Sequence, residues 1–211
     1  MANILILGAG AMGSAFTFPC LDNGNEVVLV GTLLEDKVID ELNNKKKFHK
    51  VLNQDLPDNL RVAKSRQLTE ELKKNLDLIV IAVNSKGIEW AANEISKNYN
   101  PKTPIVLLTK GLTIINNRFE TLAEKFKIIL KKNGIEKISI SGVAGPCLAK
   151  DLVRRIRSSV VLANPDLKVI KSIGKMIATD YYSIEYSNDL FGVEVCAAIK
   201  NFYSMIIGTS E

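Results

Sequence analysis

The hydrophobic residues of this chain fall into short continuous runs that are separated by amphipathic segments. Five runs rich in Ile, Leu and Val are candidates for strands, at residues 3–7, 26–30, 77–83, 104–109 and 137–141. A continuous run of this length suits a strand that is covered on both faces. The segment 60–63 is a weaker candidate for a strand.

The intervening segments place apolar residues at helical spacing, near 11–23, 34–46, 67–75, 86–98, 117–132 and 146–154. This alternation predicts βαβ units, and hence an α/β fold with a doubly wound, mostly parallel sheet of the Rossmann type. Pro19 should kink or loosen the first helix because it has no N–H donor. After residue 155 the segments SSVVLAN and YYSIEY flank a further helix near 166–178.

Charge gives little indication of a nucleic-acid partner. The net charge is only +5, and the one basic cluster, Lys45-Lys46-Lys47, follows a predicted helix end. Cations interact favourably with the dipole at that end of a helix, so we read the cluster as a solvated terminus. Because no interleaved aromatic residues accompany it, we expect no nucleic-acid partner.

Cysteine usage and hydropathy also exclude several classes of protein. Cys20, Cys147 and Cys196 are odd in number and far apart, and with His49 as the one histidine they predict neither a disulfide framework nor a metal site. The apolar run at 3–7 has no basic segment before it, and no run of about 18 apolar residues exists. We therefore expect a cytoplasmic protein without membrane insertion.

The opening "ILILGAGAMGSAF" contains Gly8, Gly10 and Gly13 in G-x-G-x-x-G spacing, directly after a predicted buried strand and at the start of a helix. In this context Gly8 permits a tight turn, Gly10 lets the backbone approach a pyrophosphate, and Gly13 allows close packing of helix on strand. The helix N-terminus offers free N–H groups to the anion. The motif predicts a dinucleotide-binding site.

The preference between NAD and NADP stays open. An acid at the end of the second strand would hold the ribose 2′-OH and disfavour a 2′-phosphate. This chain has Gly31-Thr32 there, with Glu35 and Asp36 displaced into the next helix, and no arginine that would favour NADP.

Two lysines stand in positions that suit chemistry, although each alone would read as a solvated charge. Lys110 follows a buried strand at the sheet edge where ligands bind in open α/β folds. Lys200 lies in an apolar helix, and no acid stands three or four residues away to pair with it. Gly145-Pro146 forms a strand-to-helix turn in which Pro146 suits the first helical turn and Gly145 would let a ligand approach.

The combination of these segments resembles the NAD(P)-dependent glycerol-3-phosphate dehydrogenases. The pieces "GAGAMGSA", "LPDNL", "TKGL", "SGVAGPCLAKD" and "GVEVCAAIKNFYSMIIG" occur in the order and at about the spacing of that family. The resemblance implies that Lys110 contacts substrate and nicotinamide, that Lys200 is the proton acceptor, and that Asn201 holds the substrate or positions the lysine. Further family positions near cofactor or substrate match Ala11, Met12, Thr32, Gly145, Cys147 and Ala149.

The resemblance implies a hydride transfer between NAD or NADP and the small phosphorylated three-carbon pair dihydroxyacetone phosphate and sn-glycerol 3-phosphate. Lys200 would exchange the hydroxyl proton, with Lys110 charged nearby to orient the substrate. Some positions depart from the family pattern: Ala11-Met12 replaces a frequent polar–aromatic pair, and Cys147-Leu148 replaces a hydroxyl residue and Phe. These departures concern fine specificity more than cofactor binding.

The resemblance also implies a division of the chain into a dinucleotide-binding domain over residues 1–187 and the first helix of a truncated helical substrate domain over 188–211. In the family, an aspartate and an Arg-Asn pair beyond the K-N helix complete the site. We therefore expect the 211 residues alone to be a poor catalyst. We also expect a homo-oligomer that associates through Val195, Ile199, Phe202 and Ile206.

Two other interpretations stay open at this point. A reductase of the ketopantoate type fits "GAGAMGS" equally well, although it does not fit "TKGL" or "GPCLAKD". A dinucleotide-binding module without catalytic activity fits the length of the chain.

Overall fold

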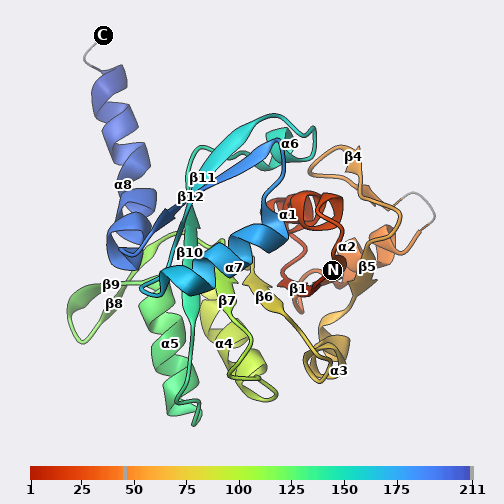
Figure 1. Cartoon of the computed structure of the whole chain (residues 1–211), viewed down its shortest axis with the longest axis horizontal. Helices are drawn as coiled ribbons and strands as arrows, with labels where there is room; N and C mark the ends of the chain where they lie inside the picture. The colour runs from red at the N-terminus through yellow and green to blue at the C-terminus, as the bar shows by residue number, and fades with distance from the viewer. Residues whose placement is uncertain (45–46, 210–211) are drawn as a thin grey trace.

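The computed structural model describes residues 1–44 and 47–209. Its centre is an eight-stranded sheet with the strand order β12-β11-β10-β7-β6-β1-β2-β5, with helices on both faces (Figure 1). The strands of this sheet are β1 (Asn3–Leu7), β2 (Glu26–Val30), β5 (Arg61–Ala63), β6 (Leu78–Ile81), β7 (Ile105–Leu107), β10 (Ile140–Ala144), β11 (Ser158–Ala163) and β12 (Tyr182–Ser187). Neighbouring strands are parallel except β10 and β11, which pair antiparallel. The predicted α/β class with a mostly parallel, doubly wound sheet is confirmed.

Eight α-helices are described, and two small hairpins lie outside the main sheet. The helices are α1 (Ala11–Asp22), α2 (Asp36–Leu42), α3 (Leu68–Leu72), α4 (Ile88–Ser96), α5 (Leu122–Lys132), α6 (Ala149–Leu152), α7 (Leu167–Ile177) and α8 (Leu190–Gly208). The hairpins are β3 (Phe48–His49) with β4 (Gln54–Asp55), and β8 (Leu112–Ile115) with β9 (Arg118–Thr121).

Two hydrophobic cores explain why the central strands of the sheet are mostly apolar. Successive side chains of a strand point to opposite faces of a sheet. In β1, Ile4 and Ile6 belong to the core that contains α1 and α7, whereas Leu5 and Leu7 belong to the core that contains α4 and α5. Since both faces are covered, the central strands such as β6 and β7 need an unbroken apolar run, which is the pattern that the sequence shows there.

The segment after β7 differs from the sequence prediction. The predicted helix over 117–132 begins only at Leu122, because residues 118–121 form the second strand of the hairpin β8–β9. Asn116 and Asn117 turn this hairpin with φ of 49° and 60°, a left-handed conformation that Asn tolerates better than most residues. Thr121 then caps α5, its hydroxyl accepting a hydrogen bond from Glu124 N–H at 3.3 Å.

Two further boundaries are shifted. The strand predicted over 137–141 is β10 at 140–144, since its pairing with β7 begins only where Ile140 meets Ile105. The helix predicted over 146–154 is the single turn α6, and it begins three residues after Pro146 because Leu148 is still extended, with φ −96° and ψ 139°. The prediction that Pro146 occupies a first helical turn was therefore wrong.

The remaining helix predictions hold with small changes in length. The helix α1 continues through Pro19 to Asp22. The helix predicted over 34–46 corresponds to α2, and of the basic cluster that follows, Lys45 and Lys46 lie outside the described residues. Lys47 is held by the protein, since its ammonium donates hydrogen bonds to the backbone carbonyl oxygens of Asp58 and Leu60.

The helix α8 begins against the sheet and then extends away from it (Figure 1). Asp189 caps its start by accepting a hydrogen bond from Gly192 N–H at 2.8 Å. Among the described residues no single helix is long and apolar enough to cross a membrane. Only the two halves of α8, Leu190–Lys200 and Phe202–Gly208, meet that test as a pair bent by 45°, by length and composition alone. The division into domains at residue 187 stays a prediction.

Candidate active site

The glycine turn lies where the strand order of the sheet reverses. After β1 the chain adds β2 and β5 on one side, and β6 and β7 follow on the other. Open α/β sheets bind ligands at such a point, at the carboxyl ends of the strands. Gly8 follows β1 with a φ of +116°, and a Cβ at this position would lie 2.7 Å from the carbonyl group of Ala82, which follows β6. Only glycine can take this backbone conformation in this space.

The other two glycines of the motif have different surroundings. A Cβ on Gly13 would lie 2.0 Å from the carbonyl oxygen of Gly8, so this glycine permits helix α1 to pack on the turn. Gly10 has an ordinary φ of −71°, and the nearest atom to an added Cβ is a carboxylate oxygen of Glu35 at 3.7 Å. The protein itself therefore does not require glycine at position 10.

The N-terminus of α1 is open. Gly10 is its cap residue and makes no side-chain capping bond, and the first turn contains no acid. The helical hydrogen bonds begin with Ser14 N–H donating to the carbonyl of Gly10 at 2.9 Å. The N–H groups of Ala11, Met12 and Gly13 therefore point out of the helix end, where the helix dipole favours an anion.

The backbone carbonyl of Ala9, in the glycine turn, is hydrogen-bonded to two buried side chains. Ala9 C=O accepts hydrogen bonds from Ser14 Oγ and from the buried ring of His49, whose Nε2 lies 3.2 Å away. Leu52 N–H donates to Nδ1 of the same ring, so the proton sits on Nε2. His49 is thus a structural residue that fixes the turn. Among the described residues, no group of three or more His, Cys, Asp or Glu could hold a metal ion.

Four of the predicted site residues meet at one small cavity beside the glycine turn. Met12, Lys110, Gly145 and Cys147 all line it, together with Phe16, Leu108, Val143, Ala144, Val160 and Tyr182. Lys110 as a whole residue is exposed, but its surroundings partly desolvate the ammonium group. This burial, together with the positive charge of Lys200, lowers the pKa of Lys110.

Lys200 borders an adjoining cavity of about 580 Å³. That cavity is lined by Ala144, Gly145, Pro146, Val161, Asp189, Gly192, Val193, Cys196, Ala197 and Lys200. Gly145 lines both cavities, and the charges of the two lysines are close enough to interact. Segments that are 90 positions apart in sequence therefore converge near Gly145. Lys200 itself is exposed, so it is not enclosed by the apolar surface of its own helix.

The turn that contains Gly145 is shaped by the sheet. Gly145 has a φ of +147°, and a Cβ there would lie 2.7 Å from the carbonyl oxygen of Ser159 in β11. Close packing on β11 therefore accounts for this glycine without any ligand. Burial raises the pKa of the neighbouring Cys147 thiol, against the opposing effects of the Ser158 hydroxyl and the Lys110 charge.

Outside the glycine turn, the predicted positions Thr32 and Ala149 line neither of these two cavities. Thr32 follows β2, on the other side of the glycine turn, and its N–H donates to the Glu35 carboxylate at 2.8 Å. Ala149 starts α6 and packs against the core that contains α1, outside the cavities that the lysines line. Asn201 falls within α8, but its side chain is outside the described part of the structure.

Glu194 is a buried acid that the sequence analysis missed. It is only 8% exposed, and one carboxylate oxygen accepts a hydrogen bond from Ala123 N–H at the start of α5, at 3.3 Å. Its other oxygen has no partner within the described residues. Burial raises the pKa of Glu194, against a hydrogen bond from Thr121. The signal in the sequence was a single acid in an apolar segment, six positions before Lys200.

Glu194 predicts a pH dependence of stability. Because the folded chain holds this proton more tightly, the group contributes stability below the unfolded pKa of about 4.3 that is lost as the pH rises through the higher folded pKa. Glu194→Gln cannot ionise. We expect its free energy of unfolding, relative to the parent chain, to rise by on the order of 1 kcal/mol from acidic to neutral pH. Urea unfolding across this range measures it, with exposed Glu136→Gln as the control; a constant difference would contradict the assignment.

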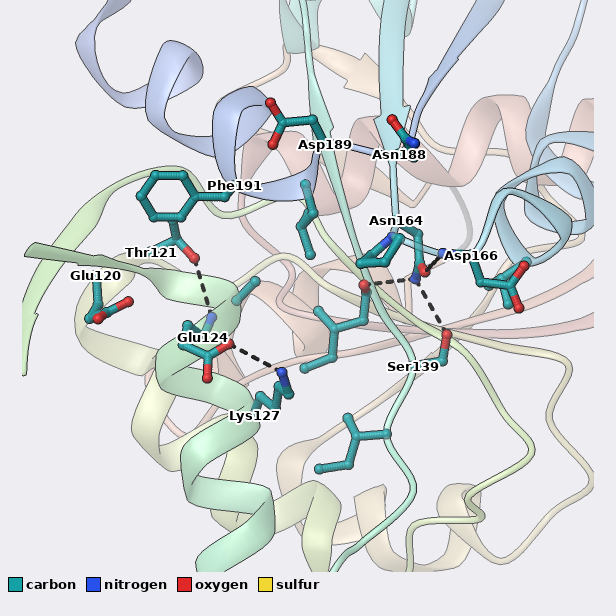
Figure 2. A pocket seen from close by; sticks show the side chains of 16 residues that line it. Glu120, Thr121, Glu124, Lys127, Ser139, Asn164, Asp166, Asn188, Asp189 and Phe191 are labelled. Atoms are coloured by element: carbon teal, nitrogen blue, oxygen red, sulfur yellow. Dashed lines mark hydrogen bonds and ion pairs between the residues drawn. The ribbon is translucent and has the colours of Figure 1, made fainter.

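A further cavity of about 690 Å³ is lined by none of the predicted site residues. It lies beside α5, β10 and the starts of α7 and α8, and Figure 2 shows its acidic side chains around an apolar floor. Most of these acids already have partners. Asp166 and Asp189 accept hydrogen bonds from backbone N–H groups at the starts of α7 and α8, and Glu124 pairs with Lys127.

Comparison with known proteins places the chain in a family. A family model described as NAD-dependent glycerol-3-phosphate dehydrogenase N-terminus matches residues 3–170. The NADP(+)-dependent glycerol-3-phosphate dehydrogenase of Archaeoglobus fulgidus is 29% identical over 204 residues, which cover 97% of this chain and 59% of that protein. The glycerol-3-phosphate dehydrogenase [NAD(P)+] of Oceanobacillus iheyensis is 26% identical over 211 residues, covering 100% of this chain and 58% of the relative. This chain thus spans about three fifths of the length of these relatives.

Solved structures agree on the fold. A glycerol-3-phosphate dehydrogenase from Coxiella burnetii superposes with a TM-score of 0.79 at 22% identity, over 95% of this chain and 58% of that one. A UDP-D-ManNAc dehydrogenase from Pyrococcus horikoshii reaches a TM-score of 0.70 at 12% identity, over 96% and 50%. The family expected from the sequence is confirmed by the match over 3–170. This chain belongs to the family of NAD-dependent glycerol-3-phosphate dehydrogenase N-terminal regions.

Proposed function

We propose that this chain takes part in hydride transfer between a nicotinamide dinucleotide and the pair dihydroxyacetone phosphate and sn-glycerol 3-phosphate. The observation that carries this proposal is the meeting of Lys110 and Lys200 near Gly145, beside the cavity that Met12 shares with Lys110. A cofactor held at the glycine turn would extend from α1 toward these two lysines. The names of the relatives support the same substrate pair and both forms of the cofactor.

The residues of the glycine turn fit a dinucleotide pyrophosphate. The N–H groups at the start of α1 face outward, and the space at Gly10 would be filled by a side chain. Thr32 and Glu35 would lie at the adenosine end, and Ala11, Met12 and Lys110 along the rest of the cofactor. Ala149 is the first residue of α6, which packs beside α1, so it would contact the cofactor from the α6 side of the glycine turn.

The two lysines would perform different tasks. When bound, a reduced nicotinamide supplies the hydride that goes to the carbonyl carbon of the substrate. Lys200 donates a proton to the carbonyl oxygen, so that the ketone becomes a secondary alcohol; in the reverse direction it accepts this proton. Its exposure lets it exchange that proton with water. Lys110 orients the substrate, with Gly145, Cys147 and Asn201 as the further residues proposed to contact it.

A single-turnover assay tests this function. The purified chain is held in excess over NADH or NADPH, and oxidation of the nicotinamide is followed with dihydroxyacetone phosphate, with ketopantoate, and with no substrate. We expect oxidation only with dihydroxyacetone phosphate, with glycerol 3-phosphate identified by mass spectrometry. Oxidation with ketopantoate alone would assign a different reductase, and cofactor binding without oxidation would assign a binding module.

We also propose that the chain self-associates through α8. Beyond residue 200 this helix exposes large apolar side chains, namely Phe202, Tyr203, Met205 and Ile206, while Val195 and Ile199 are half-buried. Exposed apolar patches of this kind commonly mark interfaces. We expect the double variant Phe202→Asp, Met205→Lys to sediment as a monomer and the parent chain as a larger species. Val51→Asp changes an exposed apolar residue elsewhere and is expected to leave the mass unchanged; a monomeric parent chain would refute the proposal.

A further inference from the structure

The acid Glu35 returns to the edge of the sheet, although it stands five positions after the end of β2. The chain turns directly after the strand, with Glu35 N–H donating to the carbonyl of Thr32 at 3.0 Å. Gly31 makes this turn compact, because a Cβ there would lie 2.6 Å from a side-chain carbon of Ile39 in α2. Glu35 therefore lies near the end of β2, although its position in the sequence displaces it toward the next helix.

The carboxylate of Glu35 joins the glycine turn to the end of β2. Its Oε2 accepts hydrogen bonds from Ala9 N–H at 2.9 Å and from Thr32 N–H at 2.8 Å. The other oxygen, Oε1, lies on the side of Gly10, 3.7 Å from where a Cβ would be. Within residues 1–44 and 47–209, both hydrogen bonds of this carboxylate go to Oε2. Oε1 is thus available to a hydroxyl group beside the pyrophosphate position.

This location is where the adenosine ribose of a dinucleotide lies in a Rossmann-type site. An acid there accepts hydrogen bonds from the ribose hydroxyls and repels a phosphate on the 2′ oxygen. On the neighbouring strand β5, Lys64 directly after the strand is already engaged, since it forms an ion pair with Asp40 of α2 at 2.6 Å. Asp36 adds a further acid directly after Glu35.

We propose that Glu35 is the residue by which this chain selects a dinucleotide without a 2′-phosphate, so that NADH binds more tightly than NADPH. This inference rests on the proposed function, since it assumes that the glycine turn binds a dinucleotide. The proposal answers the question of NAD or NADP that the sequence left open. The residue that answers it, Glu35, stands too far along the sequence from β2 to be expected at the ribose.

Calorimetric titration of the full chain with NADH and with NADPH tests the proposal without requiring turnover. We expect the parent chain to bind NADH roughly 10- to 100-fold more tightly, the scale of one like-charge contact at a partly exposed site. Glu35→Gln keeps an acceptor oxygen but removes the charge, so the ratio of the two Kd values should contract about tenfold or more. Glu41→Gln removes a charge from the same helix, where Glu41 pairs with Lys50, and should leave the ratio unchanged.

The outcomes separate the two levels of the hypothesis. If neither dinucleotide binds the parent chain, the proposed function fails. If both bind and NADPH binds as tightly as NADH, or if Glu35→Gln leaves the ratio unchanged, the role of Glu35 is refuted while dinucleotide binding stands. If circular dichroism shows that Glu35→Gln is unfolded, the parent chain is titrated at low and at high salt instead. A preference for NADH that is caused by charge must become smaller at high salt. A preference that is insensitive to salt would overturn the proposal.

Discussion

Replacing Lys200 with methionine is expected to slow the reduction of dihydroxyacetone phosphate by about 10²- to 10⁴-fold, the usual contribution of a general acid or base. Methionine keeps the apolar stem but has no proton to exchange. Because Lys200 is exposed and lies at the rim of its cavity, its replacement leaves no void in the core. The free energy of unfolding should therefore change by no more than about 0.5 kcal/mol.

Two further measurements separate a chemical role of Lys200 from a structural one. The Kd for the dinucleotide should stay unchanged, because the glycine turn is untouched. The pKa of Lys110 should rise, since the charge of Lys200 is one of the causes that lower it; NMR of the lysine side chains can follow this. Lys171→Met, an exposed lysine on α7, is the matched control. An unchanged single-turnover rate in Lys200→Met would show that this lysine only keeps the helix surface solvated.

The substitution Gly10→Val is expected to weaken dinucleotide binding by roughly 5- to 150-fold, the range that corresponds to steric overlaps of about 1–3 kcal/mol. The valine side chain would project toward the place where the backbone approaches the pyrophosphate. The fold should tolerate it, since Gly10 has a φ of −71° and an added Cβ makes only an ordinary contact at 3.7 Å. A loss of about 1 kcal/mol as a helix cap is the expected cost in stability.

The variant Gly13→Ala provides the contrast to Gly10→Val. Its methyl group would lie 2.0 Å from the carbonyl oxygen of Gly8, so α1 must move and the melting temperature should fall by several degrees. Titration calorimetry and thermal melting should therefore distinguish the two variants. Gly10→Val should lose dinucleotide affinity while it keeps its fold, and Gly13→Ala should have a lower melting temperature. If Gly10→Val bound NADH and NADPH as tightly as the parent chain, the turn would not be a pyrophosphate site.

The sequence determined the layers of the fold and the position of the glycine turn. The strands β1 and β2 have the predicted bounds, Asn3–Leu7 and Glu26–Val30, because the four residues after the first are buried in each strand and must be apolar. Gly13 is needed because of the carbonyl oxygen of Gly8, only five positions earlier, whereas Gly8 is needed both for its positive φ and for the closeness of Ala82 after β6. The family was also readable, because its motifs are short segments with fixed spacing.

Only the tertiary structure decided which side chains meet. The sequence placed Lys110 and Lys200 in separate segments, and their approach near Gly145 depends on how α8 packs against β10. The hairpin that ends at Thr121 was not predicted because residues 117–121 were assigned to the start of the following helix. The left-handed turn at Asn116 and Asn117 shows that they belong to the hairpin instead.

Two acids show most clearly what the sequence could not give. Glu35 reads as the start of a helix, yet a turn after β2 brings its carboxylate to two backbone N–H groups of different loops. Glu194 reads as one polar residue in an apolar helix, yet its burial is set by contact with the start of α5. Periodicity along a chain records which face of an element is buried. The partner that a charged side chain finds depends on distances between elements, and these are fixed only when the elements pack.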